Sequence, residues 1–450
     1  MNFFSIFPEI YLTISIMVLL VFGVIYQTRL THLSLISLLF TLYILLQNEF
    51  VTVGPLFHGV LIYDSTAFFV KIIILLSTVA ILLISPHFIF EFSILLLIST
   101  LALMCLVSAY DLIAVYLSIE LMSLSFYILA AFNRNSQFST EAGLKYFVLG
   151  ALSSGLLLFG AALMYGYTGL TNFADLIKLQ PDSLAFSLGI LFFTVSFLFK
   201  LAAVPFHQWA PDVYEGAPMP VTAFFAVVPK IGILTVLTRI VPLGQNTILI
   251  TTALASIVLG SLGALAQWRV KRLLAYSAIS HVGFLLLPLI AQNEGVNHTI
   301  YFYAIIYILM SVNFFAILLN HSHFGSTPTL GHFQSLSKTN GLLAITLALT
   351  LFSMAGIPPL AGFYGKMYVF LTLIDANYIT LALLCIVASV VGAVYYIRII
   401  KMMYFDTAPN YPISTPLSAP RALLISTNTL ILVLLFLHPQ LLLNLCYIFA

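Results

Sequence analysis

The most constraining feature of this sequence is the length of the tracts that contain no Asp, Glu, Lys or Arg. A helix that crosses the ~30 Å hydrocarbon core of a bilayer needs about 20 mostly apolar residues. Charged residues make up only 7% of the chain, against roughly a quarter in a soluble domain. The sequence therefore predicts a membrane protein with many helices. The longest such tracts are Phe92 to Tyr110, Tyr146 to Ala174, Ile240 to Trp268, Gly295 to Ser337 and Ala422 to Ala450.

Turn residues and charges divide the 450 residues into about fourteen apolar spans, so the predicted fold class is all-α, a polytopic membrane helix bundle. Between the second and third spans, Val51 to Asp64 alternates in hydropathy and turns at Gly54-Pro55, which predicts a short surface hairpin. The predicted spans are 9–27, 31–47, 65–85, 91–108, 111–132, 142–168, 185–203, 219–240, 246–267, 271–291, 299–320, 340–374 with an interruption, 378–404 and 420–448.

Composition excludes several classes of function. The formal net charge of +2 at pH 7 leaves no basic surface broad enough to hold a nucleic-acid backbone. Cys105, Cys385 and Cys446 lie far apart without a C-x-x-C spacing, so the sequence predicts neither a disulfide framework nor a thiolate metal or iron–sulfur site. Any redox chemistry is expected in other proteins.

The basic residues between spans predict the orientation, because Lys and Arg accumulate in loops on the inner side of the membrane. With fourteen spans both termini share a face, which carries only Lys178 and Arg239. We therefore expect both termini on the periplasmic or intermembrane-space side. The opposite face has nine basic residues: Arg29, Arg134, Arg269, Lys271, Arg272, Lys338, Arg398, Lys401 and Arg421.

Apart from the basic residues assigned to the two faces and the acidic residues at span starts, six charged residues lie inside the predicted spans. A charge at the centre of a span costs roughly 2.5–3.5 kcal/mol on insertion scales. Glu120 is about ten residues into its span, which places it ~15 Å deep, near the midplane. Lys200 and Lys230 are at similar depth, whereas Lys71 is near a span end and is expected to reach the headgroups. The six are Lys71, Glu120, Lys145, Lys200, Lys230 and Lys366.

Prolines predict breaks in the seventh and twelfth helices. Pro205 follows Lys200 by five residues, and Pro358-Pro359 precedes Lys366 by about two turns. A proline removes one backbone hydrogen bond, and in a membrane the freed groups persist only inside protein or beside a water-filled cavity. The deep charges are therefore expected to line a wet, protonatable path, although a static buried ion pair is the alternative for each. His207 and His281 are within reach of such a path, and hydrogen-bonded packing is the alternative for both histidines.

The sequence also predicts an internal repeat in which the fourth to eighth spans correspond to the ninth to thirteenth. Pro205 in FLFKLAAVPF matches Pro358 in LFSMAGIPPL at an offset of 153 residues. Each unit has five spans, an odd number, so the second unit must run inverted, as in many ion and solute transporters. The expected divisions are three N-terminal helices in 1–86, a first repeat in 87–240, a second repeat in 241–405 and a C-terminal helix in 406–450.

Nearly the whole chain resembles the antiporter-like membrane subunits of respiratory complex I. The resemblance rests on the strings SAYDLIAVYLSIELMSLSFYILAA, STEAGLKYFVLGALSSGLLLFG, FLFKLAAVPFHQWAPDVYEGAP, PVTAFFAVVPKIGIL, QWRVKRLLAYSAISHVGF and FSMAGIPPLAGFYGK. It implies a proton route lined by the deep charges and a histidine after the seventh-helix break. Carried over by motif, the route residues are Glu120, Lys145, Lys200, His207, Lys230 and Lys366.

The resemblance further implies a proton-translocating subunit that carries no cofactor of its own. NADH, flavin, iron–sulfur clusters and ubiquinone are then held by partner subunits, and the other partners are membrane subunits and lipids. The expected location is the mitochondrial inner membrane, with a bacterial plasma membrane as the alternative. Two other functions stay open, an Mrp-type sodium/proton antiporter and a structural subunit that does not pump.

Overall fold

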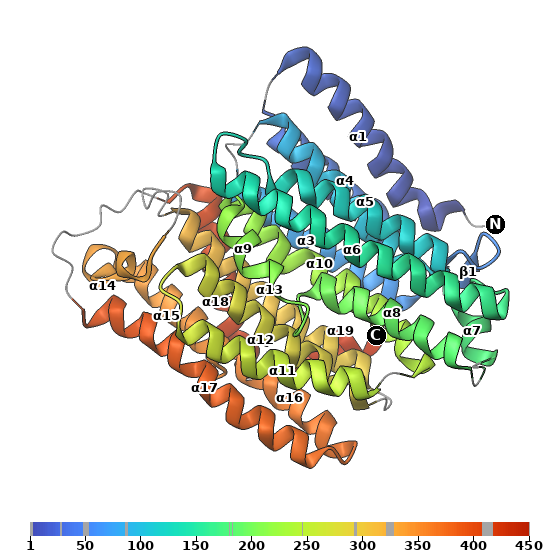
Figure 1. The fold of residues 1–450 in the computed structure, drawn as a ribbon. Helices are drawn as coiled ribbons and strands as arrows, with labels where there is room; N and C mark the ends of the chain where they lie inside the picture. The colour runs from blue at the N-terminus through green and yellow to red at the C-terminus, as the bar shows by residue number, and fades with distance from the viewer. Residues whose placement is uncertain are drawn as a thin grey trace. The chain divides into compact units, whose positions relative to one another are not determined.

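A computed structural model of the protein describes residues 3–27, 29–47, 54–85, 89–179, 181, 183–244, 246–291, 295–320, 328–406 and 417–449. Within these ranges, twelve helices are long and apolar enough to cross a membrane (Figure 1). The 17-residue helix α2 and an interrupted pair, α15 and α16, account for the two other predicted spans. The predicted all-α polytopic bundle is thus confirmed.

The chain divides into two compact units, and each is described by itself. The first unit consists of Met1–Leu201, Gly216–Gln245 and Phe449–Ala450. Its elements are α1 (Phe7–Tyr26), α2 (Thr31–Gln47), β1 (Gly54–Leu56), β2 (Leu61–Tyr63), α3 (Ser65–Ile84), α4 (Phe90–Ser108), α5 (Leu112–Ala130), α6 (Gln137–Thr168), α7 (Phe173–Leu179), α8 (Leu184–Leu201) and α10 (Met219–Ile240), with short 3-10 turns at Phe3–Ile6 and Val241–Leu243.

The second unit consists of Ala202–Glu215 and Asn246–Ile448. Its elements are α9 (Trp209–Gly216), α11 (Asn246–Leu265), α12 (Val270–Ala291), α13 (Val296–Asn320), a 3-10 turn (Leu330–Phe333), α14 (Leu336–Thr339), α15 (Gly341–Ala355), α16 (Ala361–Asp375), α17 (Ile379–Tyr404), α18 (Ala419–Leu437) and α19 (Pro439–Phe449).

Most helices of each predicted repeat pack on one another within one unit, whereas α9, from the seventh span, lies in the second unit. In the first unit, α5 packs between α4 and α6, α6 packs on α8, and α10 closes the group against α4 and α8. In the second unit, α12 packs between α11 and α13, α13 packs on α15 and α16, and α17 closes the group against α11 and α15. Each five-helix group therefore contains one helix that corresponds to a broken span.

Both predicted helix breaks are confirmed, and polar groups meet the freed backbone. The seventh span stops at Leu201 and resumes as α9, and in between the Val204 amide donates to Ser256 Oγ at 2.9 Å. The twelfth span stops at Ala355, where Gly356 has φ +83°, a left-handed conformation that glycine adopts without steric cost. After this break, the Gly362 amide donates to Ser353 Oγ at 3.1 Å.

The predicted hairpin is confirmed over Gly54–Tyr63, where β1 and β2 pair antiparallel, while residues 51–53 lie outside the described ranges.

Two span predictions were wrong in detail. The last span is not one helix over 420–448, because α18 ends at Leu437 and Pro439 begins α19, as expected of a residue with no amide N–H to continue a helix. The sixth span begins at Gln137 rather than 142, so α6 has 32 residues.

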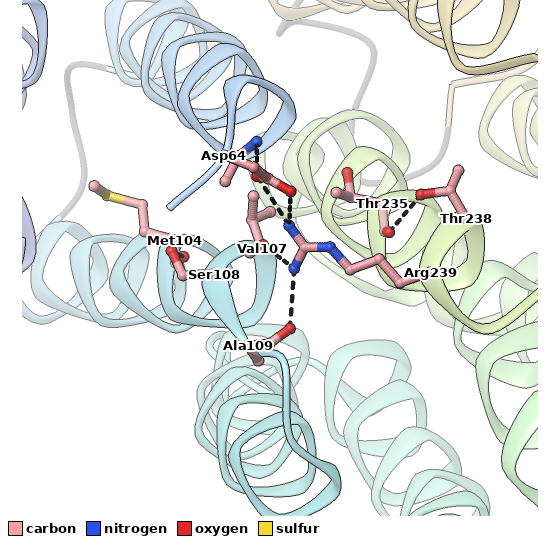
Figure 2. Close-up of polar contacts among 9 residues, drawn as sticks. Asp64, Met104, Val107, Ser108, Ala109, Thr235, Thr238 and Arg239 are labelled. Carbon is pink, nitrogen blue, oxygen red and sulfur yellow. Dashed lines mark hydrogen bonds and ion pairs between the residues drawn. The ribbon is translucent and has the colours of Figure 1, made fainter. Parts of the chain in front are cut away.

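Arg239 ties three helix ends together within the first unit (Figure 2). From the last turn of α10, its guanidinium donates to the carbonyls of Val107 and Ala109, at 2.7 and 2.9 Å, where α4 ends. It also donates to both carboxylate oxygens of Asp64 at 3.1 Å, and Asp64 caps the start of α3 by accepting from the Ala67 amide. A cation at a helix C-terminus and an anion at an N-terminus each complement the helix dipole, so the cluster stabilises this end of the unit.

Candidate functional site

Glu120 occupies the middle of its helix, as predicted. It is the ninth of the 19 residues of α5 and is half-buried. Ser123, one turn later, lies on the same face, and its hydroxyl donates to Glu120 Oε2 at 3.4 Å. Tyr127 continues this face one further turn along, as expected for residues seven apart in a helix. The sequence thus places a carboxylate, a hydroxyl and a phenol in one row.

Lys200 lies in the last turn of α8 and is buried, with only 6% of the residue exposed. Its Nζ lies 5.8 Å from the centroid of the Tyr127 ring, and it interacts electrostatically with Glu120. Among the residues that the structure describes, Lys200 Nζ has no hydrogen-bond partner. The Tyr127 hydroxyl lies near the Ser123 and Ser154 hydroxyls, without close hydrogen-bond geometry to either. We call Glu120, Ser123, Tyr127, Ser154 and Lys200 the Lys200 cluster.

Buried polar groups in proteins almost always have a hydrogen-bond partner, and ordered water supplies it where protein does not. A buried ammonium group that has no described protein partner and lies beside loosely paired hydroxyls therefore marks a position for water. A carboxylate and an ammonium joined by water can exchange a proton along the water chain. The Lys200 cluster has the chemistry of a proton-loading site.

Lys230 is also buried, in the middle of α10, where it is the twelfth of 22 residues. Pro229 precedes it inside the helix and cannot donate to the Phe225 carbonyl one turn back. The deep ammonium therefore sits beside a point where the backbone hydrogen bonding of its own helix is interrupted.

Lys366 is held by the end of a broken helix. Its Nζ donates to the carbonyl oxygens of Met354 and Ala355, at 3.1 and 2.8 Å, which are among the last carbonyls of α15. The last four carbonyls of a helix lack intrahelical donors and carry the negative end of the helix dipole, so they stabilise the charged form of this lysine. The Phe284 ring, 5.1 Å from Nζ, covers the ammonium.

His281 belongs to a hydrogen-bonded network near Lys366 in the second unit. His281 Nδ1 is 2.7 Å from the Tyr303 hydroxyl, and Nε2 is 3.1 Å from the Tyr396 hydroxyl, which is itself 2.5 Å from Ser277 Oγ. A cavity of about 10 Å³ lies between His281 and Lys366. This volume is at the lower limit for one water molecule. A single water there can connect the lysine to the histidine network.

The remaining predicted residues lie in different settings. His207 is half-buried in the turn after the seventh-span break, with its ring 6.5 Å from the Tyr276 ring. Lys145 lies on the exposed face of α6, with its side chain 42% exposed, and pairs with Glu141 one turn earlier at 2.6 Å. The structure therefore places Lys145 at the surface of this chain.

The prediction that Lys71 reaches the headgroups was wrong. Lys71 is 1% exposed and forms a 2.5 Å ion pair with Glu9 of α1, with the Tyr63 ring 5.4 Å from its Nζ. A carboxylate 62 positions earlier in the chain provides the partner, and only the packing of the N-terminal helices brings the two together. This pair is an example of the static arrangement considered for the other lysines.

Basic residues at the start of α12 contact α9: Arg269 lies just before α12, and Lys271 and Arg272 are in its first turn. Arg269 forms an ion pair with Glu215, and Arg272 pairs with Asp212 at 2.7 Å and with Glu215 at 3.3 Å. The Lys271 ammonium donates to the Glu215 carbonyl at 3.3 Å. These contacts fix the second half of the broken seventh span against the start of α12, within the second unit.

The tyrosines are the functional candidates that the sequence did not reveal. Tyrosine in this composition is expected at the membrane interface, yet Tyr303 and Tyr396 are fully buried and bond His281. Helical spacing is the sequence pattern that could have indicated them: Ser277 is one turn from His281, and Tyr127 is two turns from Glu120.

Within the described residues, no group of three or more His, Cys, Asp and Glu could hold a metal ion.

Residues 109–392 match the family of NADH:quinone oxidoreductase and Mrp antiporter transmembrane subunits. The chain belongs to this antiporter family. NADH-ubiquinone oxidoreductase chain 2 of Marchantia polymorpha is 43% identical over 98% of this chain and 96% of its own length. NADH-quinone oxidoreductase subunit N of Parvibaculum lavamentivorans is 40% identical over 97% and 95%.

A solved chain of respiratory complex I from Thermus thermophilus with bound aureothin has the same fold as this member of the antiporter family. The TM-score is 0.88 at 30% identity, covering 97% of this chain and 98% of that chain. Within the family, Lys366 predicts the subunit 2 branch, whose bacterial counterpart is subunit N, rather than subunit 4, which usually has Glu in the twelfth span. That prediction is confirmed by the names of the full-length relatives.

Proposed function

We propose that this chain is the proton-translocating membrane subunit of NADH:quinone oxidoreductase that corresponds to chain 2 and subunit N. Electron transfer from NADH through flavin and iron–sulfur clusters to ubiquinone takes place in partner subunits. This chain receives the energy as a conformational or electrostatic bias and is a translocase subunit without a redox centre.

The observation that carries this proposal is the Lys200 cluster. A permanently paired lysine such as Lys71 has its hydrogen bonds supplied by a fixed carboxylate, whereas Lys200 Nζ has none from the described protein. Its charge therefore depends on water and on the position of Glu120. Movement of Glu120 toward Lys200 favours the protonated lysine, and movement away favours release of the proton.

In the proposed sequence of transfers, Lys200 loads and passes its proton through water and His207 to Lys230. Lys366 then receives it for release, with the single-water cavity and His281 as its local relay. Ser277, Tyr303 and Tyr396 extend that relay by hydroxyl groups, which can donate and accept at once. The role of Lys145 stays a prediction from the resemblance.

The Mrp-type antiporter is the alternative from the same family. A sodium site needs several oxygen ligands, with carboxylates as the strongest. Glu120 is the one carboxylate that the sequence places at the midplane, and Lys200 beside it opposes binding of a second cation. Both features favour protons over sodium.

The expected location is the mitochondrial inner membrane, or the plasma membrane if the chain is bacterial, with both termini on the intermembrane-space or periplasmic side. Single cysteines labelled with a membrane-impermeant reagent test this orientation. A cysteine near Ile448 should be labelled from outside, and one in the loop Arg269 to Arg272 only from inside. The reverse pattern would show that the orientation is wrong. A second proposed probe position, Asn2, lies outside the described residues.

Two measurements test the function. The chain should co-purify with flavin and iron–sulfur subunits, whereas an Mrp-type antiporter would not. Proton pumping per NADH oxidised, measured in membranes beside the amount of assembled complex, then separates a pump from a structural subunit. Full pumping in assembled Lys200→Ala and Glu120→Gln complexes would falsify the proposed route.

A further inference from the structure

The first unit contains a large open groove that the proton route does not use. Its volume is about 930 Å³, within the range of ~300–1,000 Å³ that is usual for small-molecule sites. The groove lies between α1, α4, α5 and α6, and most of its lining is apolar, from side chains such as Leu20, Ile94, Ile98, Ile128 and Phe147. A groove of this composition in a membrane protein suits a hydrocarbon chain.

All four helices line the groove near one end of the first unit. The lining includes the last turns of α1 and α5 and the first turns of α4 and α6. From Phe90 to Ile98 the groove follows α4 for eight residues, a rise of ~12 Å. Half of a ~30 Å hydrocarbon core is ~15 Å, so the groove is about as deep as one leaflet.

The mouth of the groove has two opposite charges. Arg134, in the turn between α5 and α6, and Glu91, in the first turn of α4, are both exposed and both line the groove. Neither side chain has an ion pair or hydrogen bond within the described part of the chain. Thr140 adds a hydroxyl to the same rim.

We propose that the groove binds one zwitterionic phospholipid of the phosphatidylethanolamine type. The lipid phosphate binds the Arg134 guanidinium, its ammonium group lies by Glu91, and an acyl chain fills the apolar groove. Guanidinium and phosphate form charge-assisted, often bidentate hydrogen bonds. A lipid with only negative charge would satisfy Arg134 and leave Glu91 opposed, so the pair of charges selects a zwitterion.

The depth of the groove also distinguishes a lipid from a helix of a neighbouring subunit. A transmembrane helix needs contact along ~30 Å, whereas the groove offers about one leaflet. Its lining ends on α5 at Tyr127, a residue that is 8% exposed and whose ring faces Lys200. The bound acyl chain therefore separates the Lys200 cluster from the fluid bilayer.

Photo-crosslinking in the intact complex tests the site. The complex is placed in nanodiscs with phosphatidylethanolamine that carries a diazirine on its acyl chain, and labelled peptides are mapped. Labelling should concentrate on α1, α4, α5 and α6. Arg134→Gln and Val24→Trp, which remove the phosphate ligand and fill the groove, should each lower labelling there about tenfold, the effect of ~1.4 kcal/mol.

Matched controls isolate the groove. Lys401→Gln removes another exposed basic residue, and Val18→Trp adds the same bulk to an exposed position of α1 that does not line the groove. Both should label as the unaltered complex does. Glu91→Gln should raise labelling by a matching phosphatidylglycerol probe relative to phosphatidylethanolamine.

Three results would overturn the proposal. They are equal labelling in all variants, a stronger signal from phosphatidylglycerol than from phosphatidylethanolamine in the unaltered complex, and lipid labelling that falls on partner subunits and not on the groove residues. Variants that fail to assemble are recognised by loss of NADH oxidation. The lipid retained by each assembled variant after detergent washing, measured by mass spectrometry, gives the same comparison without the probe.

Discussion

Lys200 precedes one helix break and Lys366 follows the other, yet the protein surrounds the two ammonium groups differently. Lys200 has a half-buried carboxylate and a tyrosine ring nearby, and no described protein atom accepts its hydrogen bonds. Lys366 donates to two fixed backbone carbonyls at the end of α15. The same residue type beside a helix break thus has no described protein acceptor in one unit and two backbone acceptors in the other.

This difference between Lys200 and Lys366 indicates that the two lysines have different roles. Backbone carbonyls do not titrate or move away, so they hold a proton on Lys366 until another group or water competes for it. Water and a carboxylate can rearrange, so the proton on Lys200 responds to the position of Glu120. We therefore expect Lys200 to be the sensitive site for transport and Lys366 to be the sensitive site for stability.

The largest expected effect is on pumping when Lys200 is replaced. Lys200→Met keeps the volume of the side chain but removes the group that carries the proton. Loss of a positioned proton-transfer group typically costs on the order of 100-fold or more in rate. Pumping per NADH oxidised should fall accordingly, while the amount of assembled complex stays unchanged, because removal of a buried charge without a protein partner costs little stability. A failure of assembly would instead identify Lys200 as half of a static pair.

At Lys366, the larger effect is expected on stability and the smaller one on pumping. Lys366→Met leaves the Met354 and Ala355 carbonyls without their donor at a buried helix end. Each unsatisfied buried acceptor costs about 1–3 kcal/mol, so the variant, with two of them, should lose about 2–6 kcal/mol of stability. The thermal unfolding midpoint of the assembled complex measures this loss, with Lys200→Met as the matched control. If both variants unfold at the same temperature, the contrast between the two sites is wrong.

A smaller effect is expected from the carboxylate. Glu120→Gln removes the anion that favours the protonated Lys200 and should lower pumping about tenfold, which corresponds to ~1.4 kcal/mol of lost electrostatic stabilisation. Glu120→Asp keeps the charge and should retain most of the activity. The comparison is sharpened by repeating Glu120→Gln in the Lys200→Met background, where the substitution should add almost nothing.

The smallest effect concerns the buried Tyr127 hydroxyl of the Lys200 cluster. Tyr127→Phe keeps the ring against Lys200 and removes only the buried hydroxyl. If that hydroxyl orders water in the Lys200 cluster, pumping should fall about two- to threefold, consistent with the loss of one water-mediated bond. Tyr165→Phe, at an exposed position of α6, is the control. Equal pumping in the two variants would remove Tyr127 from the water positions.

The sequence alone was sufficient for most of what depends on position along a helix. Hydrophobic length determined the number of spans, and distance from the span ends placed Glu120 and Lys230 at depth. Pro205 and Pro358 lie at the two breaks, although Pro229 and Pro288 lie inside helices that stay continuous, so a proline alone does not decide where a helix breaks. Span length and depth are local in the chain, so no knowledge of neighbours was needed for them.

Only the tertiary structure decided which groups meet. Glu9 reaches Lys71, Tyr396 reaches His281, and the carbonyls of α15 receive Lys366, although each pair is separated by many residues or by a helix break. In a chain this apolar, nearly every face of every helix is hydrophobic, so periodicity does not indicate how a helix is rotated about its axis. Side-chain packing between helices sets that rotation, and with it the choice between a fixed partner and a water-filled space around each buried charge.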